Sequence, residues 1–314
     1  MAWIALKRIG QGVLQLIAVV FLIFVLISAS PGDPAARVAG EAATAEQIAE
    51  VREEMGLNRS ILVQFGEWMG DAASGDLGAS LVTNESIDAI IGRTFAPTLS
   101  MLVVSMAITL VVGGLGGMLA AIRPGGVVDR AVVASTSIAV AIPGFFLGLV
   151  LVKWFAVDLG WFPAVGYKPF LDSPTTWLHH IFLPSVALST VTAAEVTRQL
   201  RGSLTDVLQS EYIVSARARG VPRRSLIVRH GLKNAVLPVL TILGVRVSQL
   251  IGGTVVIETV FNIDGMGRTL VNAAITADID VVLGVTVVAT VAVIITNLAI
   301  ELIQPLLNPR LRAR

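Results

Sequence analysis

Three ionisable side chains interrupt apolar stretches of this 314-residue sequence: Glu195, Arg198 and Arg246. Glu195 and Arg198 are three residues apart, so a helix would place them on one face, where they can pair. Charged groups inside a membrane span are costly and usually face a bundle interior or a wet cavity. Two interpretations stay open. The three residues line a substrate path, or they form a structural pair plus an arginine that reaches the cytoplasmic interface.

The second feature that could carry a function is the basic segment 211–238. Between positions 217 and 233 it carries six Arg or Lys side chains and one histidine: Arg217, Arg219, Arg223, Arg224, Arg229, Lys233 and His230. Such a segment can bind anionic lipid, nucleic acid or another protein. One aromatic residue, Tyr212, and the lack of a nucleic-acid-binding motif argue against nucleic acid.

The spacing of small residues in this segment favours docking to a protein. Residues 212–219 suit a short helix, and Gly220 can end it as a glycine just past the last turn. Pro222 is then well placed at the first position of a second helix. A lipid-binding helix needs a bulky apolar face, which Ser215, Ala216 and Ala218 do not provide.

Signatures of catalysis and of metal binding are missing from the sequence. It has no phosphate-binding G-x-x-x-x-G-K-[ST] loop, no H-E-x-x-H and no G-x-S-x-G. With no cysteine and three histidines, thiolate sites are excluded, and His179-His180 is better interpreted as a water-facing pair than as a metal site. The glycine run at 113–117 lies inside an apolar stretch and predicts close helix packing. We expect no catalytic residue, metal or cofactor.

Composition predicts an all-α polytopic membrane protein. Hydrophobic residues make up 54% of the chain and charged residues 14%, against about 25% charged in soluble domains. Apolar runs of about 20 residues are long enough to cross a bilayer. We expect six spans, the fourth of them weak because it is rich in Ser and Thr: 9–29, 95–122, 131–157, 181–200, 237–260 and 281–302. The first run could instead be a signal peptide ending at Ser28-Ala29-Ser30, but its length favours a retained span.

A polar insertion separates the first two spans. Residues 31–93 hold eleven acidic side chains and four arginines. Thr44 and Gln47 predict a capping box that opens a short helix ending near Gly56, and 61–69 predicts another. The expected division is therefore residues 1–30 with the first span, an extracytoplasmic insertion at 31–94, and a core at 95–314.

Charge asymmetry predicts the orientation. The N-terminus, the loop near Arg123, the 201–233 segment and the tail near Arg310 are basic and fall on one side if all six spans cross. The insertion and the loop near Asp264 fall on the other side and are more acidic. The positive-inside rule then places both termini in the cytoplasm.

Segment 211–238 resembles the EAA loop of bacterial ABC importer permeases, and the whole chain resembles the B-type subunit of the dipeptide/oligopeptide/nickel family. Further matching motifs follow in the same order: Pro31-Gly32-Asp33-Pro34, Gly75-Asp76-Leu77-Gly78, Leu159-Gly160-Trp161-Phe162-Pro163, Glu258-Thr259-Val260-Phe261, Gly265-Met266-Gly267 and Asn308-Pro309-Arg310. Two departures stand out. Val214-Ser215-Ala216 replaces Glu-Ala-Ala, and Asn308 replaces the usual Asp.

The resemblance implies the fold of a type I ABC importer permease, with a cytoplasmic coupling helix between helices 4 and 5. It implies assembly in the bacterial cytoplasmic membrane with a homologous C-type permease, forming a heterodimeric permease, with two cytoplasmic ATPases that bind ATP and Mg²⁺, and with an external binding protein. Docking onto the ATPases would involve nine residues: Glu211, Tyr212, Ser215, Ala216, Arg217, Ala218, Arg219, Gly220 and Pro222.

The expected cargo is a di- or oligopeptide, and nickel or another small solute is the alternative within the family. Membrane lipid would surround the spans, and we expect no nucleic-acid partner. Two alternatives from other classes are an ion-driven secondary transporter and a membrane receptor or scaffold. An ion-driven transporter would favour paired intramembrane carboxylates, and Glu195 is the one candidate that we identify for such a role.

Overall fold

The computed structural model describes residues 2–28, 34–40 and 42–307, and within these ranges the chain is helical without any strand. Two compact units divide it: residues 1–96 with 264–294, and residues 97–263 with 295–314. The first three residues of the motif Pro31-Gly32-Asp33-Pro34 and the closing motif Asn308-Pro309-Arg310 lie outside the described residues.

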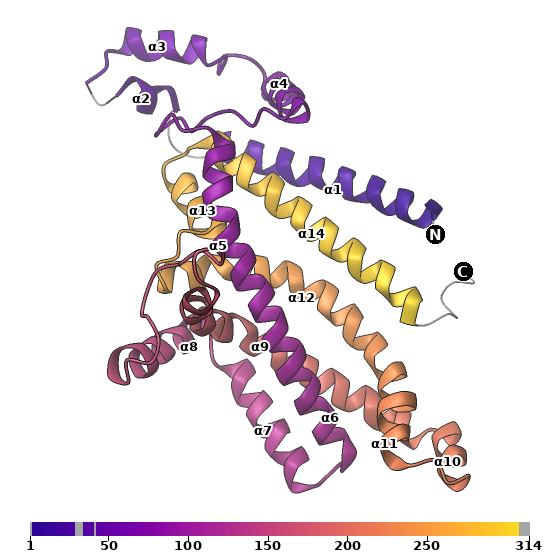
Figure 1. The fold of residues 1–314 in the computed structure, drawn as a ribbon. Helices are drawn as coiled ribbons and strands as arrows, with labels where there is room; N and C mark the ends of the chain where they lie inside the picture. The colour runs from indigo at the N-terminus through magenta and orange to yellow at the C-terminus, as the bar shows by residue number, and fades with distance from the viewer. Residues whose placement is uncertain (1, 29–33, 41, 308–314) are drawn as a thin grey trace. The chain divides into compact units, whose positions relative to one another are not determined.

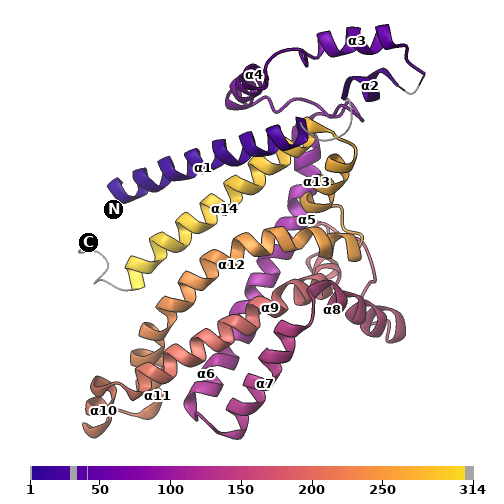
Figure 2. The ribbon, with the colours of Figure 1, turned by 180° about the vertical axis from the view of Figure 1, so that it is seen from behind.

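The first unit pairs the N-terminal helix with a C-terminal one. Helix α1 lies alongside α14 in both views (Figures 1 and 2), and Val20, Phe24 and Leu283 form a buried cluster between them. A Cβ on Gly12 would lie 2.8 Å from the side chain of Ile294, so this glycine permits the close approach. The unit comprises α1 (Ala2–Ser28), α2 (Pro34–Ala39), α3 (Ala45–Glu54), α4 (Ile61–Ser74), α13 (Met266–Ile275) and the starts of α5 (Ile87–Ile108) and α14 (Ile279–Leu307).

The predicted capping box at the start of α3 is confirmed. The Thr44 N–H donates to Gln47 Oε1 at 2.9 Å, and the Gln47 N–H donates to Thr44 Oγ1 at 3.3 Å. The helix ends one residue before Met55, close to the predicted end at Gly56. The second predicted helix, α4, runs five residues further than expected, to Ser74, and its C-cap is Gly75, whose φ is +96°.

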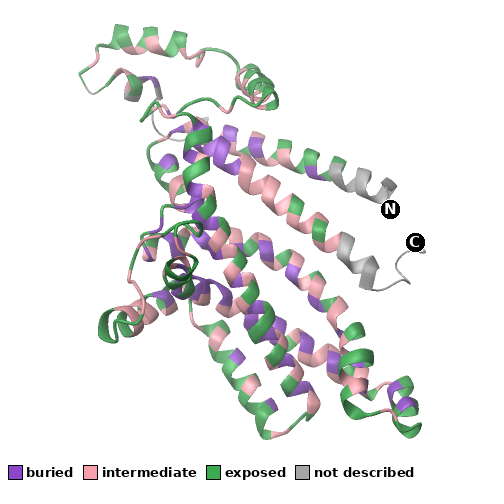
Figure 3. Cartoon of the chain, in the orientation of Figure 1, coloured by how far each residue is buried: buried purple, intermediate pink, exposed green. Residues whose placement is uncertain are grey.

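The second unit holds the remaining helices, with α9 (Pro174–Gln209) at its centre. Helices α6, α7, α8 and α12 all pack on α9, and Figure 3 shows buried residues along much of it. The other elements are η1 (Thr109–Gly113), α6 (Gly114–Ile122), α7 (Val127–Ala141), α8 (Gly144–Leu151), η2 (Val152–Asp158), α10 (Glu211–Ala218), α11 (Arg223–Ser225), η3 (Leu226–Gly231) and α12 (Leu232–Val260), the η elements being π-helical.

The central place of α9 explains its weak hydropathy. A helix surrounded by other helices buries its surface against protein, so it does not need a lipid-facing apolar coat. Small and hydroxyl-bearing residues then pack well, and Ser185, Ser189 and Thr197 are all buried in α9. The helix is 36 residues long, which is longer than the predicted span 181–200.

The glycine run at 113–117 packs directly on α9, as predicted. A Cβ on Gly113 would lie 2.8 Å from the side chain of Val196, and one on Gly117 would lie 2.8 Å from the backbone oxygen of Thr197. Because neither position has room for a side chain, the spacing of these glycines sets the distance between the two helices.

The expected single span at 131–157 is broken in the structure. Helix α7 ends at Ala141, Ile142 and Pro143 are extended, and α8 leaves at an angle of 100° to α7. Proline disfavours helical backbone at the residue before it, which accounts for the break at Ile142.

Length and composition identify three helical stretches able to cross a membrane among the described residues: Ile87–Ile122, Arg223–Val260 and Ile279–Glu301. The bent pair of α7 with α8 and η2 adds a fourth if it is one span, and Gly10–Leu26 is a shorter apolar helix. The count of six spans therefore stays a prediction, and so do the domain boundaries at residues 30 and 94.

Candidate functional site

The short helix α10 follows the central helix α9 after one residue. Ser210 has extended backbone angles and serves both as the C-cap of α9 and as the N-cap of α10. Helix α10 ends as predicted, because Gly220 adopts a left-handed conformation with φ +83°. The Gly220 N–H donates to the Arg217 oxygen at 2.9 Å and the Val221 N–H to the Ala216 oxygen at 3.2 Å. These two bonds define a Schellman motif, which a glycine adopts without strain.

Helix α10 has an inner and an outer face. Ile213 and Ala216 are buried and pack with Leu226 of η3. Ser215 and Ala218 are exposed and lie outside this cluster. The exposed side therefore offers the small side chains of Ser215 and Ala218 next to the larger Val214, which is 54% exposed. The inner face fixes the helix to the rest of the unit.

The remaining predicted docking residues surround this helix. Glu211 lies in the first turn, where a carboxylate interacts favourably with the helix dipole. Arg217 and Arg219 are exposed near the C-terminal end, where positive charge is favourable. Tyr212 is 46% exposed, and its hydroxyl accepts a hydrogen bond of 2.9 Å from Asn234 Nδ2 of α12.

Pro222 does not occupy the predicted first helical position. It is the N-cap of α11, one residue earlier, with ψ 140°. From Arg223 the chain stays helical through η3 into α12, giving a continuous stretch of 38 residues to Val260. Most of the predicted basic segment is therefore the first turns of a long helix and not a loop.

Arg223 connects this long helix to the turn between α6 and α7. Its Nη2 donates to the oxygen of Ile122, the last residue of α6, at 2.8 Å. The last carbonyls of a helix lack partners within the helix, so an arginine that bonds one of them stabilises the helix end. Figures 1 and 2 show α10 and α11 at the end of α9 that lies next to this turn.

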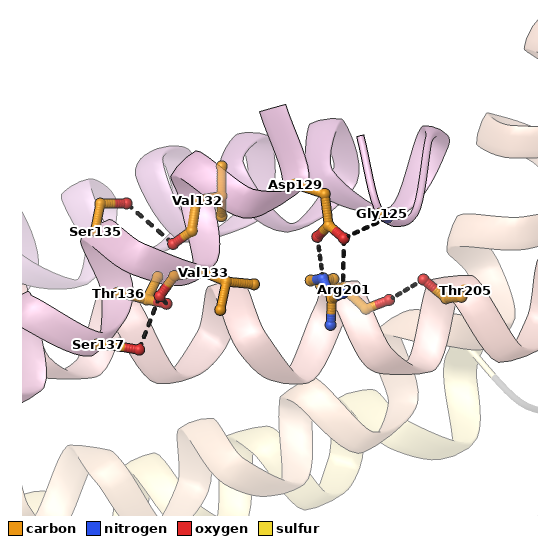
Figure 4. A network of polar contacts seen from close by, with 9 residues as sticks. All are labelled: Gly125, Asp129, Val132, Val133, Ser135, Thr136, Ser137, Arg201 and Thr205. Atoms are coloured by element: carbon orange, nitrogen blue, oxygen red, sulfur yellow. Dashed lines mark hydrogen bonds and ion pairs between the residues drawn. The ribbon is translucent and has the colours of Figure 1, made fainter. Parts of the chain in front are cut away.

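Asp129 and Arg201 join the same turn to α9 (Figure 4). Arg201 Nη2 donates to Asp129 Oδ2 at 2.8 Å, and its Nε contacts the other carboxylate oxygen. The Gly125 N–H also donates to Asp129 Oδ2, at 2.7 Å. The Asp129 side chain is only 4% exposed. Sequence reasoning missed this pair, although an acid just after Gly125-Gly126 in a basic turn is a usable signal.

The three ionisable residues predicted to lie within spans meet at one cavity. It has a volume of about 440 Å³ and lies where α9 and α12 pack together. Arg246 Nε contacts Glu195 Oε2, so the ion pair joins the two helices and differs from the predicted pairing of Glu195 with Arg198. The lining residues are Glu195, Arg198, Gln199, Thr241, Ile242, Val245 and Arg246.

A second cavity shares Arg246 with the first. It has a volume of about 270 Å³ and a largely apolar lining that includes Phe145, Leu188, Val191 and Ile257. Arg246 also contacts the amide oxygen of Gln249, which lines the second cavity. The two cavities therefore lie one after the other along α9 and α12, and Arg246 borders both. We call this path the α9–α12 groove.

Glu258 is a further polar residue of α12 whose burial the sequence did not indicate. It is fully buried, and Thr98 Oγ1 donates to its Oε1 at 2.6 Å. A carboxylate buried in a membrane protein needs such partners. Its motif, Glu258-Thr259-Val260-Phe261, was noted only as part of the family resemblance.

Comparison with known protein families covers nearly the entire chain. Residues 113–313 match the family described as binding-protein-dependent transport system inner membrane component. Residues 1–102 match the N-terminal family of membrane components of the same transport systems.

Relatives with similar sequences match along their full length. A probable peptide ABC transporter permease of Sinorhizobium fredii is 37% identical over 307 residues, covering 98% of each chain. A putative peptide transport system permease of Brucella abortus is 35% identical over 312 residues, covering 99% of each. A glutathione transport system permease, GsiC, of Pectobacterium atrosepticum is 36% identical over 307 residues, covering 98% of each.

Among solved structures, the chain is similar to a chain of the MetNI methionine ABC transporter in an inward-facing conformation. The TM-score is 0.57 and the sequence identity is 20%. The match covers 70% of this chain and 96% of that chain. At this identity the similarity concerns the fold.

Proposed function

The chain belongs to the family of inner-membrane components of binding-protein-dependent transport systems. On that premise we propose that it imports peptides and that its conformational change is driven through helix α10. It is a permease subunit of an ABC importer with the predicted type I fold. Peptide cargo is supported by relatives named as peptide and glutathione permeases, since glutathione is itself a modified tripeptide.

The observation that carries the coupling proposal is the direct connection of α10 to both helices that line the charged cavity. Helix α10 adjoins α9 at Ser210, and Ile213 packs on Leu226 at the start of the stretch that becomes α12. A rigid-body movement of α10 would therefore shift α9 and α12 together. Alternating access in transporters works through such movements of packed helices around a fixed site.

The outer face of α10 is the surface on which we propose that a cytoplasmic ATPase docks. Ser215 and Ala218 are exposed and small, so a partner's cleft can enclose the helix closely. The ATPases would bind ATP and Mg²⁺, and this chain would hydrolyse nothing. A second, C-type permease, two ATPase subunits and an external binding protein complete the proposed complex in the cytoplasmic membrane.

The topology that fits this proposal has six spans with both termini in the cytoplasm and the insertion at residues 31–94 outside. Under this topology α10, the α6–α7 turn and the start of the Arg223–Val260 stretch share the cytoplasmic side. Lipid would contact the exposed apolar side chains of the spans, such as Val111 and Val112.

Purification and uptake together test the proposal. Tagged chain extracted from its native membrane should bring down ATPase subunits, and cells should accumulate labelled trialanine only while ATP is present. The matched control is an ionophore that abolishes ion gradients while ATP is maintained. Uptake that survives ATP depletion and stops with the ionophore would identify an ion-driven transporter instead. A chain that purifies without ATPases and moves no solute would support a receptor or scaffold.

A further inference from the structure

Arg198 is the one guanidinium in the charged cavity that makes no ion pair within the described part of the chain. The cavity contains one carboxylate, from Glu195, and two guanidiniums, from Arg198 and Arg246. Glu195 is paired with Arg246. Arg198 is exposed and lines the cavity. The lining thus carries one uncompensated positive charge.

The neighbours of Arg198 leave its charge available. Gln199 uses its Nε2 to donate to Ser203 at 3.1 Å, so this amide is oriented along α9. Ile242 and Val245 form the apolar part of the wall on α12. Because Arg198 is exposed, its charge is accessible to a carboxylate that enters the cavity.

The shared wall at Arg246 gives the groove two chemically different parts. The larger cavity holds the charge of Arg198, and the smaller one is lined mainly by apolar residues. A peptide has a matching division, with a carboxylate at one end and side chains of varied polarity before it. An arginine fork binds a carboxylate through two parallel hydrogen bonds, which adds geometric specificity to the attraction.

We propose that Arg198 determines specificity by holding the terminal carboxylate of the peptide during its passage along the α9–α12 groove. This inference rests on the proposed peptide-import function and adds the group of the cargo that the permease itself recognises. In this arrangement Arg246 is a positioning residue, because its pairing with Glu195 prevents that acid from neutralising Arg198.

Uptake of two matched probes by the complete complex tests the inference. The probes are labelled trialanine and its C-terminal amide, which differ only in the carboxylate. The variants are Arg198→Gln, which removes the charge, and Arg198→Lys, which keeps it. Arg130→Gln is the matched control, since Arg130 is an exposed arginine outside both cavities.

Arg198→Gln should lower trialanine uptake about tenfold or more, the scale of a lost charge-assisted hydrogen bond. Uptake of the amide should stay at the level of the unaltered complex. Arg198→Lys keeps the charge but loses the fork, so its trialanine uptake should lie between that of Arg198→Gln and that of the unaltered complex. Arg130→Gln should keep all trialanine uptake. Co-purification with the ATPases and basal ATP hydrolysis should be unchanged in all three variants.

Three results would overturn the inference in distinguishable ways. If Arg198→Gln takes up trialanine at the unaltered rate, Arg198 does not contact the carboxylate, while the importer function stands. If it loses trialanine and amide uptake by the same factor, its role is structural. If the unaltered complex shows no ATP-dependent uptake of trialanine, the peptide cargo fails and this inference fails with it.

Discussion

Asp129 and Arg201 form a two-point ion pair that links the start of α7 to the C-terminal half of α9. The carboxylate also accepts the Gly125 N–H, so the turn after α6 is fixed by the same side chain. Arg223 reaches the end of α6 from the other direction, through the Ile122 oxygen. The C-terminal half of α9 is therefore connected by hydrogen bonds to the turn between α6 and α7. Arg223, a few residues after α10, contacts the same turn.

Replacing Asp129 by Asn should destabilise the protein, because Arg201 would lose a charged partner in a mostly buried place. Hydrogen bonds between charged groups are stronger than those between neutral groups. We expect the melting temperature of the purified complex to fall by several degrees in Asp129→Asn. Thermal aggregation measured in detergent compares the melting temperature of this variant with that of the unaltered complex.

A double-mutant cycle provides the control for this pair. Arg201→Gln alone should also destabilise, and the double variant should be no worse than the poorer single variant, because the two residues act on each other. Additive losses would contradict the claim that the pair acts as one unit.

Gly220 should tolerate asparagine but not valine. Its φ of +83° is accessible to Asn and strained for a β-branched residue, although the space where a Cβ would lie is open to 4 Å. The strain of about 1–2 kcal/mol would loosen the end of α10. We expect Gly220→Val to lose about tenfold in ATP-driven uptake and to co-purify with less ATPase, while membrane insertion is kept.

Gly220→Asn is the matched control and should import at close to the unaltered rate. A second pair of variants separates strain from docking. Ala218→Trp adds a bulky side chain to the outer face without altering the backbone. Ala218→Ser is its matched control, because serine adds little bulk. Normal uptake by both Gly220→Val and Ala218→Trp would contradict docking through α10.

Glu195→Gln should slow release of cargo, because Arg246 would then add a second uncompensated positive charge to the cavity. A peptide carboxylate would be held more strongly. The apparent KM and the maximal uptake rate for trialanine should both fall, by about fivefold for roughly 1 kcal/mol of extra attraction.

The double variant Glu195→Gln with Arg246→Gln restores the original charge balance and should recover the KM. Uptake kinetics that match the unaltered complex in Glu195→Gln, combined with a lowered melting temperature, would identify the pair as purely structural.

Local features were predictable from the sequence because their signals are local. The capping box at Thr44 and the helix stop at Gly220 depend on residues within a few positions of each other. The glycine run at 113–117 indicated close packing without identifying the partner helix. Pro143 gave a usable signal for the break after α7, but the long apolar run around it favoured a single span.

Long-range pairing could not be predicted in the same way. Asp129 and Arg201 are 72 residues apart, and Thr98 and Glu258 are 160 apart. The sequence predicts that Glu195 can pair with its near neighbour Arg198, whereas helix packing places Arg246 against it as the ion-pair partner. Sequence spacing determines which residues share a helical face, but the choice of partner depends on which face of another helix lies opposite.

Glu258 should be needed for stability. Glu258→Ala would leave a void in a fully buried site and remove the acceptor of Thr98 Oγ1. The combined cost is about 2–4 kcal/mol. We expect a large loss of folded protein for Glu258→Ala and a smaller one for Glu258→Gln, measured as the yield of monodisperse complex. Equal yields for both variants and the unaltered chain would contradict this role.

The proposed topology can be tested by cysteine labelling, since the natural chain has no cysteine and gives no background. Ala73 is exposed on α4 within the insertion, and Val127 is 84% exposed at the start of α7. A membrane-impermeant maleimide should label Ala73→Cys once it has access to the outer face of the cytoplasmic membrane. It should label Val127→Cys only after that membrane is permeabilised. The opposite pattern would reverse the orientation, and labelling of both positions without permeabilisation would show that an even number of crossings separates them.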